Sequence, residues 1–353
     1  MARKIKFRPN INQPSLFDEP ALIEKFRAAS PAPEEPHQSI RDFVVEVSRT
    51  RHGSGTAPRS ALEMDPTALQ PVSTLSFMSF GSGSSGNCAY IGDETGGVLI
   101  DAGVEPDEVK AGLKANGLSM NDVKGICLTH DHSDHVRYVY SLVRKHQHIG
   151  VYCTPRILQG LLRRHSISRR LKDYYKPIYK EFSFRIANFE ITPFDVSHDG
   201  SDNAGFFIVS GDHRFAVATD LGCITERVEY YMRQAQHIMI ESNYDAEMLR
   251  TGPYPLYLKS RIAADTGHLD NAVTARFVAS LADGPLRNIF LCHLSHDNNL
   301  PDIAVGAVRT ALLEAGVSGV GDASGSPEAR ECAVQLMALP RFDATPLMKL
   351  RLD

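Results

Sequence analysis

The sequence of 353 residues lacks tryptophan, long hydrophobic runs and an excess of either charge. A helix that spans a bilayer needs about 20 consecutive apolar residues, whereas the longest apolar runs, such as residues 289–292, have the length of a strand. The sequence therefore predicts no membrane partner. With 38 Lys and Arg against 42 Asp and Glu, the net charge of −4 predicts no strong attraction of the whole molecule to polyanions. Any contact with nucleic acid must come from a local patch.

Cysteine is also sparse. The six cysteines are scattered, with no CxxC pair and no spacing typical of a disulfide framework. The first ten residues lack the apolar stretch of a signal peptide. Both features predict a reducing, cytoplasmic location.

Proline is concentrated at the N-terminus, where nine of the 20 prolines fall in the first 72 residues. This composition predicts a mostly disordered extension over residues 1–72, followed by one globular domain over residues 73–353. Residues 39–50 are the one part of the extension with the pattern of a short helix or strand.

One short motif within the extension suggests a partner. Gln13, Leu16 and Phe17 fit a QxxLF pattern, which resembles peptides that dock in the hydrophobic pocket of the bacterial sliding clamp. A disordered tail with two apolar anchors could tether an enzyme to such a clamp and raise its local concentration on DNA. We therefore treat the sliding clamp as a possible partner.

From residue 73 onward, short β-branched runs alternate with segments of helical periodicity. A Gly211-Asp212 turn between two apolar runs predicts a hairpin. Strands with interleaved helices in both halves of the domain predict an α/β fold in which helices cover the outer faces of the sheets. The expected strands are residues 74–80, 97–101, 125–129, 151–154, 206–210, 214–220, 237–242 and 288–294, and residues 182–196 are expected to be rich in strand. The expected helices are 105–117, 134–146, 224–235, 271–282 and 301–315.

Four potential metal ligands lie within six residues at the junction between a predicted strand and the next helix. They are His130, His132, Asp134 and His135. Imidazole and carboxylate groups are costly to bury without partners, and a divalent ion at the end of a strand satisfies several of them at once. His130 and His132 alternate along an extended segment, while Asp134 and His135 begin a helix and can reach a second ion. The cluster therefore predicts two adjacent metal ions.

Three further candidates follow hydrophobic strands. His198, Asp220 and His293 each stand where a predicted strand ends. The ends of strands are where α/β proteins commonly place functional side chains on a rigid support. Together with the four-residue cluster, they complete two three-ligand sites and supply one carboxylate that can bridge.

The sequence resembles the metallo-β-lactamase fold superfamily, which has five motifs. In order along the chain, these motifs match Asp101, residues 130–135, His198, Asp220 and His293. The resemblance covers residues 73–353 and implies a four-layer αββα sandwich. It also implies that Asp101 holds a ligand imidazole by a hydrogen bond. The ligands it implies are His130, His132 and His198 for one ion, Asp134, His135 and His293 for the other, and Asp220 as a bridge.

Residues 80–92, 241–271 and 291–301 resemble the WalJ/YycJ/VicX subfamily, which is associated with DNA exonuclease activity. This resemblance implies that His268 lies near the scissile phosphate and that Ser84, Ser85 and Asn87 of the Gly/Ser-rich loop contact substrate. Backbone N–H groups and hydroxyls of such a loop can cradle a phosphate.

Two divalent ions can hold a hydroxide between them and stabilise both oxygens of an in-line displacement. A phosphodiester suits such a site because its nonbridging oxygens can bind metal directly. We expect Asp134 to deprotonate the nucleophile and His268 to protonate the leaving oxygen. The donor set suits Zn²⁺, Mn²⁺ or Fe²⁺, and the availability of each metal often decides which is bound.

Residues 156–185 contain nine Lys and Arg against two acidic residues, interleaved with tyrosines. Basic side chains neutralise phosphates and aromatic rings stack on bases. The segment therefore predicts a nucleic-acid contact through Arg163, Arg164, Arg169 and Arg170, and the subfamily resemblance implies that the nucleic acid is DNA.

Three alternatives remain open. An RNA-processing nuclease would use the same catalytic residues, but the 73 residues between Asp220 and His293 leave no room for the inserted β-CASP domain of many RNA-acting relatives. A thioester or lactone hydrolase would need an apolar acyl pocket. A non-enzymatic scaffold is disfavoured because every ligand position is filled.

Overall fold

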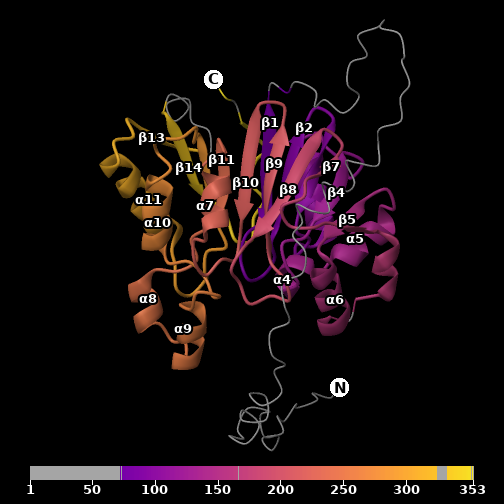
Figure 1. The fold of residues 1–353 in the computed structure, drawn as a ribbon, viewed down its shortest axis with the longest axis horizontal. Helices are drawn as coiled ribbons and strands as arrows, with labels where there is room; N and C mark the ends of the chain where they lie inside the picture. The colour runs from indigo at the N-terminus through magenta and orange to yellow at the C-terminus, as the bar shows by residue number, and fades with distance from the viewer. Residues whose placement is uncertain (1–71, 73, 166, 324–331, 351, 353) are drawn as a thin grey trace, which may run out of the picture. The chain divides into compact units, whose positions relative to one another are not determined.

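The computed structural model describes residues 72, 74–165, 167–323, 332–350 and 352 (Figure 1). The chain separates into two units, Met1–Met64 and Asp65–Asp353, and every element below belongs to the second. The clamp-like motif and the segment 39–50 lie outside the described residues. The boundary near Ser73, the disorder of the extension and the clamp contact stay predictions.

The first half of the domain supplies most of one mixed sheet, whose strand order is β15-β1-β2-β3-β4-β5-β6. Strands β3, β4, β5 and β6 run parallel to one another, whereas β1 and β2 pair antiparallel. The bounds are β1 (Leu75–Gly81), β2 (Cys88–Asp93), β3 (Gly96–Ile100), β4 (Val123–Cys127), β5 (Gly150–Cys153), β6 (Tyr175–Pro177) and β15 (Met348–Leu350).

The second half supplies the other sheet, whose order is β13-β14-β12-β11-β10-β9-β8-β7. The β9–β10 hairpin turns at Gly211, whose φ of +56° is the left-handed conformation that glycine adopts without strain. The bounds are β7 (Phe184–Ile186), β8 (Phe189–Asp195), β9 (Ala204–Ser210), β10 (His213–Ala218), β11 (His237–Glu241), β12 (Asn288–Cys292), β13 (Val320–Asp322) and β14 (Val334–Ala338).

Helices cover the outer face of each sheet, which confirms the αββα sandwich (Figure 1). Helices α3, α5 and α6 pack on the first sheet, and α7, α10 and α11 pack on the second. The helices are α3 (Pro106–Ala115), α4 (Ser133–Val136), α5 (Val139–Lys145), α6 (Pro155–Arg164), the 3₁₀ turn η1 (Arg169–Asp173), α7 (Glu226–Met232), α8 (Ala246–Thr251), α9 (Leu256–Ile262), α10 (Asn271–Ala279) and α11 (Pro301–Glu314).

A buried aromatic cluster joins the two sheets. Phe77 of β1 lies 4.2 Å from Phe290 of β12 and 5.3 Å from Phe215 of β10, measured between ring centroids. Burial of each such side chain contributes about 1.5–3 kcal/mol to stability. All residues of β11 and β12 are buried, because these central strands face the other sheet on one side and helices on the other.

The segment expected to form one helix over residues 134–146 is broken into α4 and α5. The carbonyl of Asp134 accepts a hydrogen bond from the backbone N–H of Asn87, and the N–H of Tyr138 donates to the carbonyl of Ala102. These two bonds replace the one that a continuous helix would form between residues 134 and 138. The break ties the start of α4 to the loops after β1 and β3.

Within the described residues, no helix has both the length and the apolar character that crossing a membrane requires.

Candidate metal centre

The predicted ligands follow strands that end on the same side of the sandwich. Strands β10, β11 and β12 are parallel, and β8 runs in the same direction because β9 lies antiparallel between β8 and β10. The carboxyl ends of such strands meet at one edge of a sheet. Asp220, His293 and His198 follow three of these ends, and α4 faces them from the loop after β4 in the other sheet.

The first predicted ligand set comes together in space. Donor atoms of His130, His132 and His198 all lie within 4.8 Å of one another. Nε2 of His198 is 3.2 Å from Nδ1 of His132. Burial lowers the pKa of His130 well below its usual value, and the nearby His135 lowers it further. His130 is therefore neutral, the state in which imidazole binds a metal.

The second predicted set also converges. Donor atoms of Asp134, His135 and His293 lie within 4.8 Å of one another. Oδ2 of Asp134 is 3.5 Å from Nε2 of His135 and 3.5 Å from Nε2 of His293. Although burial opposes ionisation, the charge of His135 holds the pKa of Asp134 below its usual value.

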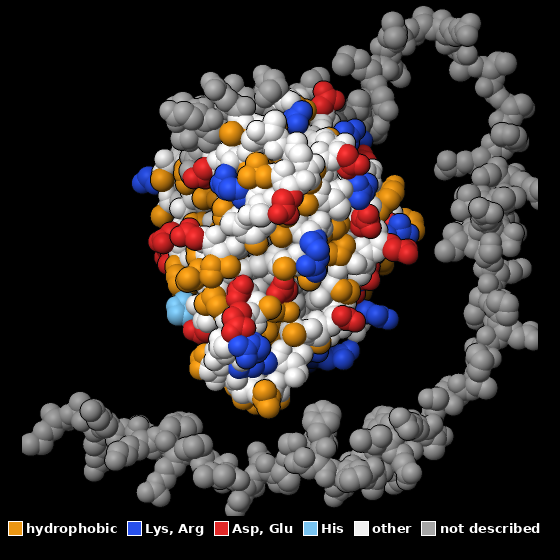
Figure 2. Space-filling view, turned by 90° about the vertical axis from the view of Figure 1, so that its left-hand side faces the viewer, with side chains coloured by type: hydrophobic (Ala, Val, Ile, Leu, Met, Phe, Trp, Pro, Cys, Tyr) orange, Lys and Arg blue, Asp and Glu red, His pale blue; other side chains and the backbone are white. Residues whose placement is uncertain are grey.

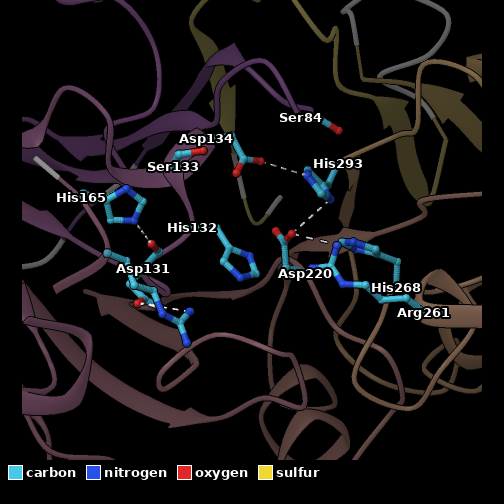
Figure 3. A pocket seen from close by; sticks show the side chains of 11 residues that line it. Ser84, Asp131, His132, Ser133, Asp134, His165, Asp220, Arg261, His268 and His293 are labelled. Atoms are coloured by element: carbon cyan, nitrogen blue, oxygen red, sulfur yellow. Dashed lines mark hydrogen bonds and ion pairs between the residues drawn. The ribbon is translucent and has the colours of Figure 1, made fainter. Parts of the chain in front are cut away.

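Asp220 lies between the two sets. Its Oδ2 is 3.1 Å from Nε2 of His135, and its Oδ1 is 3.3 Å from Nδ1 of His293 and 3.8 Å from Nε2 of His198. Figure 3 shows dashed contacts that join Asp134, His293, Asp220 and His268 in a row. All seven predicted ligands thus lie in one cluster.

Several donor atoms in this cluster are buried without a hydrogen-bond partner. They include Nε2 of His130, Oδ2 of Asp220 and Nε2 of His293. An orphaned buried polar atom is costly, and three in one cluster of imidazoles and carboxylates are what a divalent cation satisfies. The residues present therefore fit a metal site.

Asp101 holds one imidazole of the cluster in place. Its Oδ2 is 2.7 Å from Nδ1 of His135, and its carboxylate also accepts bonds from the backbone N–H and the hydroxyl of Thr129. A bond at Nδ1 directs Nε2 of His135 toward the cluster.

Three of these residues have a left-handed backbone. The φ values are 62° at Asp101, 46° at Asp220 and 54° at His293. Asp101 and His293 directly follow a strand, and Asp220 is the second residue after β10. Such values are uncommon outside glycine and persist where the surroundings impose them. The sharp turns bring these side chains back over the edge of the sheet.

The sequence analysis missed Glu241, the last residue of β11, whose side chain is fully buried. Its Oε1 accepts bonds from Nδ1 of His268 and Nδ1 of His293, each at 2.8 Å. Its Oε2 accepts the backbone N–H groups of Leu221 and Leu269. The signal was present, because Glu241 ends a hydrophobic strand as the predicted ligands do.

The three predicted substrate-binding residues of the Gly/Ser-rich loop after β1 lie in three different surroundings. Ser84 lines a cavity of about 370 Å³ over the cluster (Figure 3). Ser85 lines a separate cavity, and its carbonyl accepts a bond from Arg137. Asn87 is buried and donates to Oδ2 of Asp134, so it supports the cluster from behind.

Of the four predicted arginines, only Arg164 is among the described residues that line this cavity, where it pairs with Asp131 at 3.6 Å. Arg163 donates to Gln159, and Arg170 pairs with Asp173. Arg169 lies in η1, outside the cavity lining. A second arginine, Arg261 of α9, lines the cavity and was not predicted.

Comparisons with known proteins agree with this geometry. A family model described as a beta-lactamase superfamily domain matches residues 97–293. The chain is 34% identical over 255 residues to the exodeoxyribonuclease YycJ of Bacillus anthracis, covering 70% of this chain and 93% of the relative. It is 30% identical over 241 residues to the exodeoxyribonuclease WalJ of Streptococcus pneumoniae, covering 68% of this chain and 88% of the relative.

Solved structures share the fold at low sequence identity. The metallo-beta-lactamase fold protein YhfI from Bacillus subtilis matches with a TM-score of 0.55 and 14% identity, covering 77% of this chain and 98% of that one. Zn²⁺-bound PqqB from Methylobacterium extorquens matches with a TM-score of 0.52 and 16% identity, covering 76% and 99%. The His/Asp clusters are consistent with the metal site typical of this fold. The chain therefore belongs to the metallo-β-lactamase superfamily, as a hydrolase related to the YycJ and WalJ exodeoxyribonucleases.

Proposed function

We propose that this protein is a metal-dependent phosphodiesterase that acts on nucleic acid, specifically a DNA exonuclease. The observation that carries the proposal is the convergence of seven ligand-type side chains whose buried donor atoms include three without partners. We assign one Zn²⁺, Mn²⁺ or Fe²⁺ ion to His130, His132 and His198, a second to Asp134, His135 and His293, and Asp220 to both. When bound, such ions supply Lewis acidity and lower the pKa of water at the site.

Asp134 is positioned to accept the proton of the attacking water. Its side chain is 17% exposed and lines the cavity, while Nδ2 of Asn87 donates to its Oδ2 at 3.2 Å. A carboxyl is ionised at neutral pH, as a proton acceptor requires. Asn87 fixes the direction in which the carboxylate points.

His268 is positioned to donate a proton to the leaving oxygen. Its Nδ1 donates to Oε1 of Glu241, which leaves Nε2 as the nitrogen available to substrate in the cavity. Burial opposes protonation of His268, but the charge of Glu241 raises its pKa above the usual value. Glu241 thus keeps His268 oriented and protonated.

The lining of the cavity favours a phosphodiester over a thioester or lactone. None of the described residues that line it is hydrophobic, so no aliphatic or aromatic hydrocarbon side chain is there to hold an acyl chain. Arg164 and Arg261, whose side chains are 51% and 57% exposed, are available to bind the anionic backbone. The choice of DNA rests on the names of the curated relatives.

A substrate panel tests this function. Labelled duplex DNA, single-stranded DNA, RNA, a carboxylic ester and a thioester are incubated with the full chain loaded with Zn²⁺, Mn²⁺ or Fe²⁺. We expect products shortened from a DNA end, and loss of activity on chelation. Faster cleavage of RNA would assign the RNA-processing alternative. Hydrolysis of the ester or thioester alone would contradict the proposal.

The arginine contact is tested by salt dependence. Each duplex phosphate contact contributes about −0.9 to the slope of log K against log salt concentration. We expect Arg164→Glu to reduce the magnitude of the slope for DNA binding by about 1.

The control is Arg144→Glu in the last turn of α5, which makes the same charge change outside the cavity lining. An unchanged slope in Arg164→Glu, measured by fluorescence anisotropy, would show that this arginine does not contact phosphate.

A further inference from the structure

Helix α9 presents the two most exposed large hydrophobic side chains in the described part of the domain. Leu256 is 82% exposed and Tyr257 is 77% exposed, and α9 contains no buried residue. Hydrophobic side chains lie at the lower end of the surface in Figure 2, the end at which α9 lies in Figure 1. Exposed apolar side chains grouped in this way commonly mark a binding surface.

The helix is held in place without burying these side chains. Nζ of Lys259 donates to the carbonyl of Arg250 at 2.7 Å, and the carbonyl of Ile262 accepts the N–H of His268 at 2.8 Å. Gly267 packs so closely that a Cβ there would lie 2.3 Å from the carbonyl oxygens of Arg261 and Ile262. Leu256 and Tyr257 are therefore not needed to dock α9.

The same helix reaches the candidate metal centre. Arg261, in its last turn, lines the cavity and binds Oδ2 of Asp199 at 2.7 Å. Oδ1 of Asp199 is 3.4 Å from Nε2 of His132 and 3.5 Å from Nε2 of His198. Five residues of helix, about 8 Å along its axis, separate Leu256 from Arg261. Tyr257 is four residues before Arg261 and therefore lies on the same face of the helix, one turn from the cavity lining.

The charge of the two flanking helices favours a polyanion. Helix α9 carries Lys259 and Arg261 and no acidic residue, and α6 ends in Arg163 and Arg164 and also has none. These helices lie on opposite sides of α4 in Figure 1, and each contributes one arginine to the cavity. A strand that crosses the site between them meets cations on both sides.

We propose that α9 binds the single-stranded part of a DNA substrate, with Tyr257 and Leu256 packing against unpaired bases beside the scissile phosphate. The proposal rests on the proposed nuclease function and specifies its substrate. Aromatic and apolar side chains beside cations are the combination that binds single strands, because unpaired bases expose their faces. A blunt duplex offers phosphates alone to this helix.

The test measures binding of the metal-loaded full chain to fluorescent phosphorothioate probes by anisotropy. One probe is a single strand of thymidines, and the other is a blunt duplex of equal length. We expect the single strand to bind more tightly, and Leu256→Ala/Tyr257→Ala to weaken its binding at least about tenfold, in line with the cost of losing stacked bases. Duplex binding should be much less affected.

The matched control is Tyr230→Ala, which removes a tyrosine that is 55% exposed on α7, away from the cavity lining. If the double variant binds the single strand as tightly as the wild type does, or loses affinity equally for both probes, the proposed role of α9 is overturned. So would a dimer that dissociates in the double variant with no change in binding, because a second copy would then cover the helix. A wild-type chain that shows the binding pattern but hydrolyses no phosphodiester would overturn the proposed function alone.

Discussion

The substitution Asp220→Asn is expected to lower the rate of phosphodiester hydrolysis by roughly a thousandfold or more. Loss of the bridging charge weakens metal binding, and the lost ions would supply Lewis acidity that is worth several kcal/mol. The amide keeps the shape of the side chain but not its charge. Asp220 is 3% exposed and lies within 4 Å of four histidines, so no solvent ion replaces its charge. The bound metal should fall together with the rate.

The control is Asp212→Asn, at the exposed turn that precedes the same strand, β10. We expect this variant to retain its activity and its metal content. Circular dichroism establishes that both variants are folded, and elemental analysis counts their metal. Full activity in a folded Asp220→Asn protein would contradict the bridging role.

The substitution His268→Ala is expected to lower the rate on DNA by about a hundredfold to ten-thousandfold, the usual contribution of a positioned acid. The loss should depend on the leaving group. A nucleoside 4-nitrophenyl phosphodiester releases a stable phenolate that needs no proton, so its hydrolysis should fall far less. His268 is outside the assigned ligand set, and its loss should therefore leave the metal content unchanged.

Glu241 provides a second variant. Its Oε1 also accepts the Nδ1 bond of the assigned ligand His293, so the two rates are compared per bound metal ion. In Glu241→Gln, the amide nitrogen must face either the two imidazole N–H groups or the two backbone N–H groups that the carboxylate now accepts. We expect His268 to lose its orientation. The rate of DNA hydrolysis should then fall more than the rate of hydrolysis of the 4-nitrophenyl phosphodiester.

The exposed Glu190→Gln on β8 is the control for this change. Equal losses on both substrates would make Glu241 and His268 structural residues only.

The architecture could be predicted from the sequence because the long strands are buried, and a buried strand is recognisable as an apolar run. Residues 237–242 and 288–294 were expected to be strands, and they proved to be β11 and β12. Short elements were missed where tertiary contacts decide the structure. Helix α9 buries no side chain, and the break between α4 and α5 depends on hydrogen bonds to loops far away in the sequence.

The site residues that could be predicted are ligand-type side chains that follow the ends of hydrophobic strands. His130 and Asp220 stand out in this way, and Glu241 would have done so by the same rule. Pattern alone could not place the arginines. Arg164 and Arg261 both line the cavity although they are nearly a hundred positions apart, and the direction of each side chain depends on a local carboxylate, Asp131 or Asp199.

The central claim is that seven side chains from distant segments hold divalent cations. Elemental analysis of the folded full chain, after loading with Zn²⁺, Mn²⁺ or Fe²⁺ and removal of free ions, tests it most directly. The account predicts about two tightly held ions per chain, as a binuclear hydrolase requires. A folded protein that retains none of these ions under any loading condition would contradict it.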